Sequence, residues 1–175
     1  MKYLLMLLCF TLSSGICAAT TTSEDIVNIK RAMILAVESS RVTDSLYTEL
    51  SARNSASPLI IAYTGTLEAL KAKHSWNPYQ KLKYVARSQK TLQKALKAEP
   101  NNLEIRFMRF SIQHYTPAFL GYSNELTEDR QMIVKQFSNK NFGDTDAGLR
   151  ASIAKFMIAS DRCTSEEVKL LRKYI

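Results

Sequence analysis

The sequence predicts an all-α protein in which about eight antiparallel helices are joined by short loops. Apolar residues recur at helical spacing through most of the chain, and residues that can cap helices stand before these runs. No stretch alternates apolar and polar residues clearly enough to predict a strand. The chain has 175 residues, which is enough for one substantial buried core. We therefore expect a single helical domain over residues 20–175.

Residues 1–19 have the pattern of a secretory signal peptide. Lys2 supplies a short basic start, residues 3–10 are apolar, and small residues follow up to the expected cleavage after residue 19. The apolar run is shorter than the roughly 20 residues that a membrane-spanning helix needs. We expect the mature chain to be exported, periplasmic or secreted, without a transmembrane segment. A lipid anchor at Cys17 is the alternative, although Ile16 stands where lipoprotein processing prefers a small residue.

The first four helices are predicted from apolar spacing and from two strong start signals. Apolar residues three and four positions apart predict the first two helices. Ser57 and Asn77 can each cap a first turn, and each precedes a proline, which fits there because its missing N–H would have no partner. Gln80 can complete a capping box with Asn77. The four helices are expected over residues 24–37, 42–53, 59–73 and 78–98.

Polar or proline-containing turns separate the last four helices. Thr127 is the expected cap of the sixth helix, and Asp144 or Thr145 opens the seventh. Thr164 with Glu167 three residues later forms a capping box for the last helix. The four helices are expected over residues 103–115, 127–137, 145–159 and 165–175.

Positive charge is concentrated in the fourth predicted helix and the segment before it. The formal net charge is +8, and residues 69–98 contain eight Lys or Arg residues and no Asp or Glu. Five of the eight fall at i, i+4, i+7, i+11 and i+14, which places them in one line along a helix. Like charges at these spacings cost about 0.2–0.5 kcal/mol per pair unless something acidic faces them. This line, the basic stripe, consists of Lys83, Arg87, Lys90, Lys94 and Lys97.

The fifth predicted helix is apolar on nearly all sides, which places it near the centre of the array. Its polar line consists of Arg106, Arg109 and Gln113. The two arginines could grip a carboxylate or phosphate of a ligand in a groove. They could equally pair with buried acids from neighbouring helices, and the sequence leaves both alternatives open.

Aromatic residues stand at two turns. Trp76 and Tyr79 flank the start of the basic helix, where exposed aromatic side chains beside lysines can stack on sugar rings or bases. A Trp in this position can instead close the core at a helix end. The apolar loop with Phe119 and Tyr122 is expected to turn inward, with a contact surface as the alternative.

A second pattern in the basic helix involves its small and apolar residues. The pattern begins with a small residue and a bulky one, continues with Ala and an apolar residue, and ends with Pro. These positions are Ser88, Leu92, Ala95, Leu96 and Pro100. This order resembles the second helix and exit turn of a tetratricopeptide repeat (TPR). The resemblance covers one half-repeat, because the preceding helix lacks the Trp-Leu-Gly-Tyr set of the first half. It implies a TPR-like array in which paired helices approach closely at small residues.

Residues 103–113 (LEIRFMRFSIQ) and 118–122 (AFLGY) carry a further resemblance. They look similar to an uncharacterised family of exported proteins of Bacteroidota, and the similarity spans about residues 57–137. The resemblance implies a helical fold and an exported location, and it implies no activity.

The sequence contains no motif that predicts catalysis. His74 and His114 are its two histidines, and neither stands at the spacing of a metal-ligand motif. A Gly-x-Ser-x-Gly elbow, a P-loop and a dinucleotide fingerprint are all absent. Paired acids occur in first helical turns, where the helix dipole accounts for them. We expect no enzyme, no cofactor and no metal.

A strongly basic exported protein is suited to acidic partners. We expect a non-enzymatic binding or scaffold module that recognises an acidic protein or peptide in the cell envelope. The alternative is a polyanion binder that takes anionic lipid or acidic glycan along residues 78–98, whereas nucleic acid is not expected. The candidate binding residues are the basic stripe (Lys83, Arg87, Lys90, Lys94 and Lys97), Arg106, Arg109, Gln113, Trp76 and Tyr79.

Overall fold

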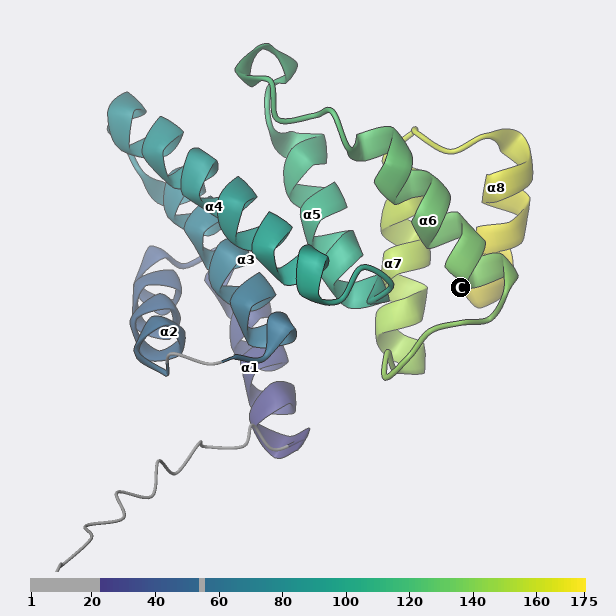
Figure 1. Cartoon of the computed structure of the whole chain (residues 1–175), viewed down its shortest axis with the longest axis horizontal. Coiled ribbons are helices and arrows are strands. Elements are labelled where there is room, and N and C mark those ends of the chain that lie inside the picture. Colours follow the sequence, from purple (N-terminus) through teal and green to yellow (C-terminus); the bar gives the residue numbers. More distant parts are fainter. Residues whose placement is uncertain (1–22, 54–55) are drawn as a thin grey trace, which may run out of the picture.

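The computed structural model describes residues 23–53 and 56–175 (Figure 1). These residues form eight α-helices and two short 3-10 helices and contain no strand, which confirms the predicted all-α class. The expected signal peptide, residues 1–19, and the alternative lipid site at Cys17 lie outside the described residues. Within that part of the chain, no helix has both the length and the apolar character to cross a bilayer. The helices are α1 (Ser23–Ala36), α2 (Ser40–Ala52), α3 (Pro58–His74), α4 (Pro78–Ala98), α5 (Leu103–Tyr115), η1 (Ala118–Leu120), α6 (Leu126–Ser138), α7 (Ala147–Ala159), α8 (Ser165–Leu171) and η2 (Arg172–Tyr174).

Predicted side-chain caps are present at the starts of α4 and α8. Asn77 accepts hydrogen bonds from the N–H groups of Tyr79 and Gln80, at 2.9 and 3.3 Å. Thr164 and Glu167 form the predicted capping box of α8. These side chains satisfy N–H groups that have no partner within the helix. The start of α4, and with it the turn from α3, is therefore fixed by local hydrogen bonds.

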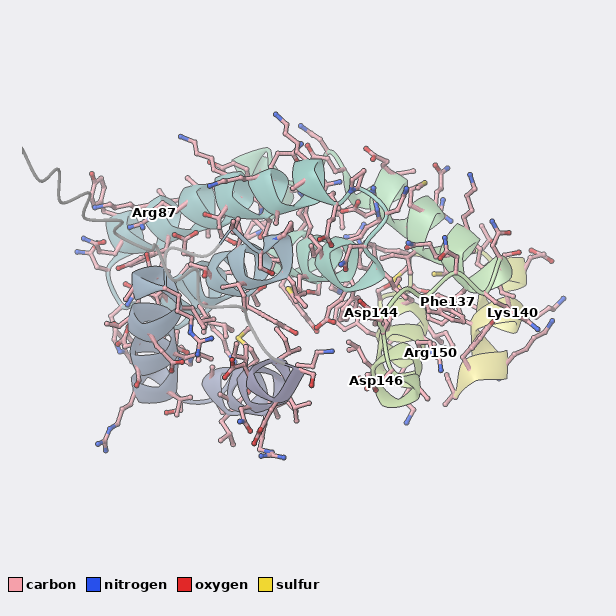
Figure 2. All side chains as sticks on the ribbon, turned by 60° about the horizontal axis from the view of Figure 1, so that its bottom comes forward. Arg87, Phe137, Lys140, Asp144, Asp146 and Arg150 are labelled. Carbon is pink, nitrogen blue, oxygen red and sulfur yellow. The ribbon has the colours of Figure 1, made fainter. Side chains whose placement is uncertain are left out.

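The starts of α6 and α7 differ from the prediction. Thr127 lies inside the first turn of α6, because the helix already begins one residue earlier. The cap of α7 is Asp146, whose carboxylate accepts the Leu149 N–H at 2.9 Å, instead of Asp144 or Thr145. Figure 2 labels both Asp144 and Asp146 near the start of α7. The backbone N–H of Leu149 holds the pKa of Asp146 below its usual value, because it stabilises the carboxylate.

Buried apolar residues form two clusters that meet at α5. The first cluster is mainly aliphatic and includes residues of α1 to α5, whereas the second is rich in Phe and extends from α5 to the carboxyl end. α5 contributes Ile105 and Met108 to the first cluster and Leu103 and Phe110 to the second. Figure 1 shows α5 between α4 and α6. Its nearly uniform apolar character therefore matches a central position with neighbours on several sides.

α3 and α4 approach each other closely. A Cβ atom at Gly65 of α3 would lie 3.0 Å from Cγ and 3.2 Å from the backbone N of Leu92 in α4, which is tighter than ordinary contact. Ser88 and Ala95 of α4 are fully buried. These small residues belong to the pattern that resembles a TPR half-repeat, and that identity stays a prediction. The close α3–α4 interface fixes which side of α4 faces outward.

Candidate functional site

The basic stripe lies on the exposed side of α4. Within the described part of the chain, its four lysines form no ion pair with any carboxylate. Arg87 is the exception, because its Nε lies 3.2 Å from Oε1 of Glu68 in α3. It also donates a hydrogen bond to the Tyr47 hydroxyl at 2.7 Å. Figure 2 labels Arg87 on α4, and its contacts make it part of the α3–α4 interface.

Glu68 is the buried acid of that interface. Its residue is 3% exposed, and its second carboxylate oxygen accepts a hydrogen bond from the Thr91 hydroxyl at 2.7 Å. A buried carboxylate is tolerated when it is paired and hydrogen-bonded. Arg87 therefore has a structural partner inside the protein, whereas Lys83, Lys90, Lys94 and Lys97 are available to a partner outside it.

Arg106 and Arg109 face inward and pair with Asp129 of α6. Both arginines are 3% exposed, and Asp129 is fully buried. Arg109 donates to both carboxylate oxygens at 2.7 Å, and Arg106 adds a third hydrogen bond at 2.6 Å. Burial disfavours the charge on Arg109, but the hydrogen bonds and charge of Asp129 outweigh it and raise the pKa of the guanidinium. The structure thus removes Arg106 and Arg109 from the candidate binding surface, because α6 encloses this side of α5.

Gln113 continues the polar line of α5, but its hydrogen bonds are incomplete. Its Nε2 donates to Oε1 of Gln89 at 3.1 Å and to Oε2 of Glu125 at 2.8 Å. Its own Oε1 and the Nε2 of Gln89 are buried without a hydrogen-bond partner among the described residues. Buried polar atoms without a partner are unfavourable. One acceptor and one donor therefore lack a partner beneath the surface, and a side chain must turn before a group from outside can bind them.

A groove of about 560 Å³ contains these amides. Lys90, Lys94 and Lys97 line it from α4, Gln113 lines it from α5, and Tyr122 and Glu125 line it from the segment before α6. In Figure 1, α4 and α6 lie on either side of α5, with the segment before α6 beyond the end of α5. The structure therefore brings Gln113 and three members of the basic stripe to one groove, here called the lysine groove.

The buried ion pairs of α5 also support the lysine groove. Gln93, which lines the groove from α4, accepts a hydrogen bond from Arg109 at 2.6 Å. The same guanidinium is held by Asp129. Arg109 therefore acts from beneath the groove by fixing one of its side chains, although it is not itself exposed to a ligand.

A smaller hollow of about 350 Å³ lies on the other flank of α4. Leu50, Ile60 and Ile61 give it an apolar side, and Lys90 and Lys94 border it as they border the lysine groove. These two lysines therefore stand on the ridge between two hollows and can reach into either.

The aromatic residues at the start of α4 are exposed. Trp76 is 98% exposed and Tyr79 is 71% exposed, so Trp76 does not close the core. The expected inward turn of the second aromatic loop is wrong for Phe119, which is 86% exposed. Tyr122 from the same loop lines the lysine groove. Trp76 and Tyr79 are not lining residues of that groove, so the candidate residues of the sequence fall into two separate surfaces.

Five lining residues of the lysine groove were not among the predicted binding residues, namely Gln89, Gln93, Gly121, Tyr122 and Glu125. Gln89 and Gln93 directly precede Lys90 and Lys94 and repeat at the same interval of four, which was a usable signal. Tyr122 and Glu125 lie in an irregular segment, whose path no periodicity predicts. Comparison with protein-family models, curated proteins and solved structures finds no match to this chain.

Proposed function

We propose that the protein is a non-enzymatic binding module that holds an acidic peptide segment of a partner protein in the lysine groove. The observation that carries this proposal is the convergence of three lysines without an ion-pair partner on one groove, which is also lined by two glutamines whose amides each keep one buried atom without a hydrogen bond. The lysines supply positive charge for acidic side chains. The amides supply the hydrogen bonds that a peptide backbone needs.

The free atoms at the groove suit a peptide backbone in particular. Once its side chain turns toward the groove, the Oε1 of Gln113 can accept from a backbone N–H, and the Nε2 of Gln89 can likewise donate to a backbone C=O. A peptide carries both groups in every residue other than proline. A groove of this volume falls in the range of about 300–1,000 Å³ that is common for binding sites.

Glu125 supports a particular orientation of the bound segment across the groove. Its carboxylate accepts from Gln113 and lines the groove away from α4. Acidic side chains of a ligand are repelled by Glu125 and attracted by Lys94 and Lys97. The acidic residues of the partner are therefore expected to face α4, and its neutral residues to face the segment before α6.

The signal-peptide pattern of residues 1–19 supports an exported location, which places the partner in the cell envelope or outside the cell. A binding role accounts for the groove without any chemical step. Its titratable lining groups are three lysines, the phenol of Tyr122 and one carboxylate that already accepts a hydrogen bond. No pair of them is arranged as a nucleophile with its base or as a general acid with a general base.

The test measures binding of a fluorescein-labelled peptide of alternating Glu and Gly residues to residues 20–175 by fluorescence anisotropy. The double variant Lys94→Gln with Lys97→Gln removes two charges from the lysine groove and is expected to weaken binding about tenfold. The matched control is Lys81→Gln with Lys83→Gln. It removes the same charge from the same helix but outside the groove, and it is expected to leave the affinity nearly unchanged.

An equal loss of affinity in both double variants would contradict the groove. If binding also weakened steeply as the salt concentration rose, the alternative of a polyanion bound along residues 78–98 would replace it. A peptide that fails to bind the unaltered protein at low salt would remove the proposal altogether.

A further inference from the structure

The turn before α4 and its first two turns expose three large apolar side chains. Trp76 is 98% exposed, Tyr79 71% and Leu82 49%. Tyr79 and Leu82 are three residues apart and therefore lie on one side of the helix. Asn77 caps α4 between Trp76 and Tyr79, so these side chains project from a fixed turn. They form the apolar tip of α4, which Figure 1 shows at an outer corner of the molecule.

Positive charge accompanies the apolar tip. Lys81 and Lys83 are exposed and form no ion pair within the described part of the chain. Lys73, at the end of α3, is already paired with Glu38 at 3.3 Å. No Asp or Glu occurs anywhere in residues 69–98. A surface that covers the apolar tip must therefore be both acidic and able to take up apolar side chains.

The shape of the apolar tip distinguishes between such surfaces. Trp76, Tyr79 and Leu82 line neither of the two hollows that flank α4. A sugar chain or a peptide is usually held in a concave site with polar groups that fix its orientation. A bilayer accepts a projecting end, because Trp and Tyr settle at the level of the lipid headgroups while Lys stays near their phosphates.

We propose that the apolar tip docks on an anionic lipid bilayer, with Trp76, Tyr79 and Leu82 in the headgroup region and Lys81 and Lys83 against lipid phosphates. Stable attachment to a membrane surface generally takes two contributions, an apolar one and a basic one. The apolar tip offers both within about two helical turns. This proposal does not depend on the lysine groove, which uses other residues of α4.

Docking in this way would leave the lysine groove open. Leu82 and Lys97 are fifteen positions apart, which corresponds to roughly 22 Å along a helix. The far end of α4 can therefore stand away from the lipid surface while the near end touches it. A partner held in the groove would then be kept close to the membrane without contacting it.

Trp76 is the only tryptophan of the chain, so its fluorescence reports the apolar tip alone. The probe is a vesicle of phosphatidylcholine with one quarter phosphatidylglycerol, added to residues 20–175 in low salt. The emission of Trp76 is expected to move to shorter wavelength and to become protected from a soluble quencher. Vesicles of phosphatidylcholine alone are expected to produce little change.

Variants that keep Trp76 test each contribution. Lys81→Gln with Lys83→Gln is expected to reduce partitioning onto the anionic vesicles about 30-fold. Tyr79→Ser with Leu82→Ser is expected to reduce it strongly as well. Phe119→Ser is the matched control for the loss of an exposed aromatic side chain, and Lys94→Gln with Lys97→Gln is the control for the loss of charge. Both controls are expected to bind vesicles like the unaltered protein.

Three results would overturn the proposal. The first is a Trp76 emission that does not respond to anionic vesicles. The second is an equal loss of partitioning in the two lysine double variants, which would indicate general charge attraction. The third is a change of Trp76 emission on addition of the acidic peptide but not of the vesicles, which would assign the apolar tip to a protein partner. The Lys81→Gln, Lys83→Gln double variant is the control in the peptide test and the test variant in the vesicle test. Failure of one proposal can therefore be distinguished from failure of the other.

Discussion

The α3–α4 and α5–α6 interfaces each bury one carboxylate, but they neutralise it differently. Asp129 is enclosed with two arginines that are themselves buried, whereas Glu68 is paired with Arg87, whose side chain is 48% exposed. The helices that carry the arginines explain this difference. α5 is apolar on its other sides, so its polar line is carried into the interior, whereas α4 is apolar on one side and keeps its basic line at the surface. Basic residues that line up along one side of a helix can therefore be buried, as in α5, or exposed, as in α4, and their spacing alone does not determine which.

The largest effect is expected from removing the buried acid of each of these two interfaces. Asp129→Ala leaves two buried guanidinium groups without their partner and is expected to lower the free energy of unfolding by about 3–5 kcal/mol. Glu68→Ala is expected to cost less, about 1–3 kcal/mol, because Arg87 can turn toward water. Urea denaturation monitored by circular dichroism measures both. Equal losses in the two variants would mean that exposure of the arginine does not matter, and the contrast between the interfaces would fail.

An intermediate effect is expected from overfilling the α3–α4 interface. Ala95 is fully buried in α4, and Ala95→Leu is expected to destabilise the protein by about 1–3 kcal/mol, because the larger side chain does not fit. Ala98→Leu is the matched control, since Ala98 is exposed on the same helix, and it is expected to change stability by less than about 0.5 kcal/mol. A loss below that value for Ala95→Leu would also count against the TPR-like helix pairing.

The smallest effect on stability is expected from charge reversal in the basic stripe, and its sign should differ between Arg87 and Lys94. Lys94→Glu turns repulsive contacts with Lys90 and Lys97 into attractive ones and is expected to stabilise the free protein by a few tenths of a kcal/mol. Arg87→Glu is expected to lower the melting temperature, because it places a second carboxylate beside Glu68. Thermal unfolding of the two single variants measures the difference. Melting temperatures that change in the same direction would mean that Arg87 and Lys94 have equivalent environments.

Signals that act within one helix predicted much of this fold. Asn77 and Thr164 cap helices as expected, the basic stripe lies on one side of α4, and the apolar character of α5 predicted its central position. Contacts between helices could not be predicted from those signals. The acidic pair that contains Asp129 was explained by the helix dipole alone, since nothing within α6 indicates that two arginines of α5 reach it.

The candidate site was predicted less completely than the fold, for a related reason. Lys90, Lys94, Lys97 and Gln113 were candidates in the sequence, but their meeting in one groove depends on how α4 packs beside α5. Tyr122 and Glu125 follow an irregular path that local signals do not describe. The exposure of Trp76 was one of two alternatives, because a single sequence contains no information on whether another helix covers that turn.

The position of α5 has a consequence for the thermodynamics of association. α5 contacts both α4 and α6, and it contributes to both apolar clusters. Helices held by two cores lose little further conformational freedom when a ligand arrives, so the entropic penalty of ordering the receptor is small. The entropy lost when an acidic segment binds is then chiefly that of the ligand and of the exposed side chains of Lys90, Lys94 and Lys97, because the helices behind them are already ordered.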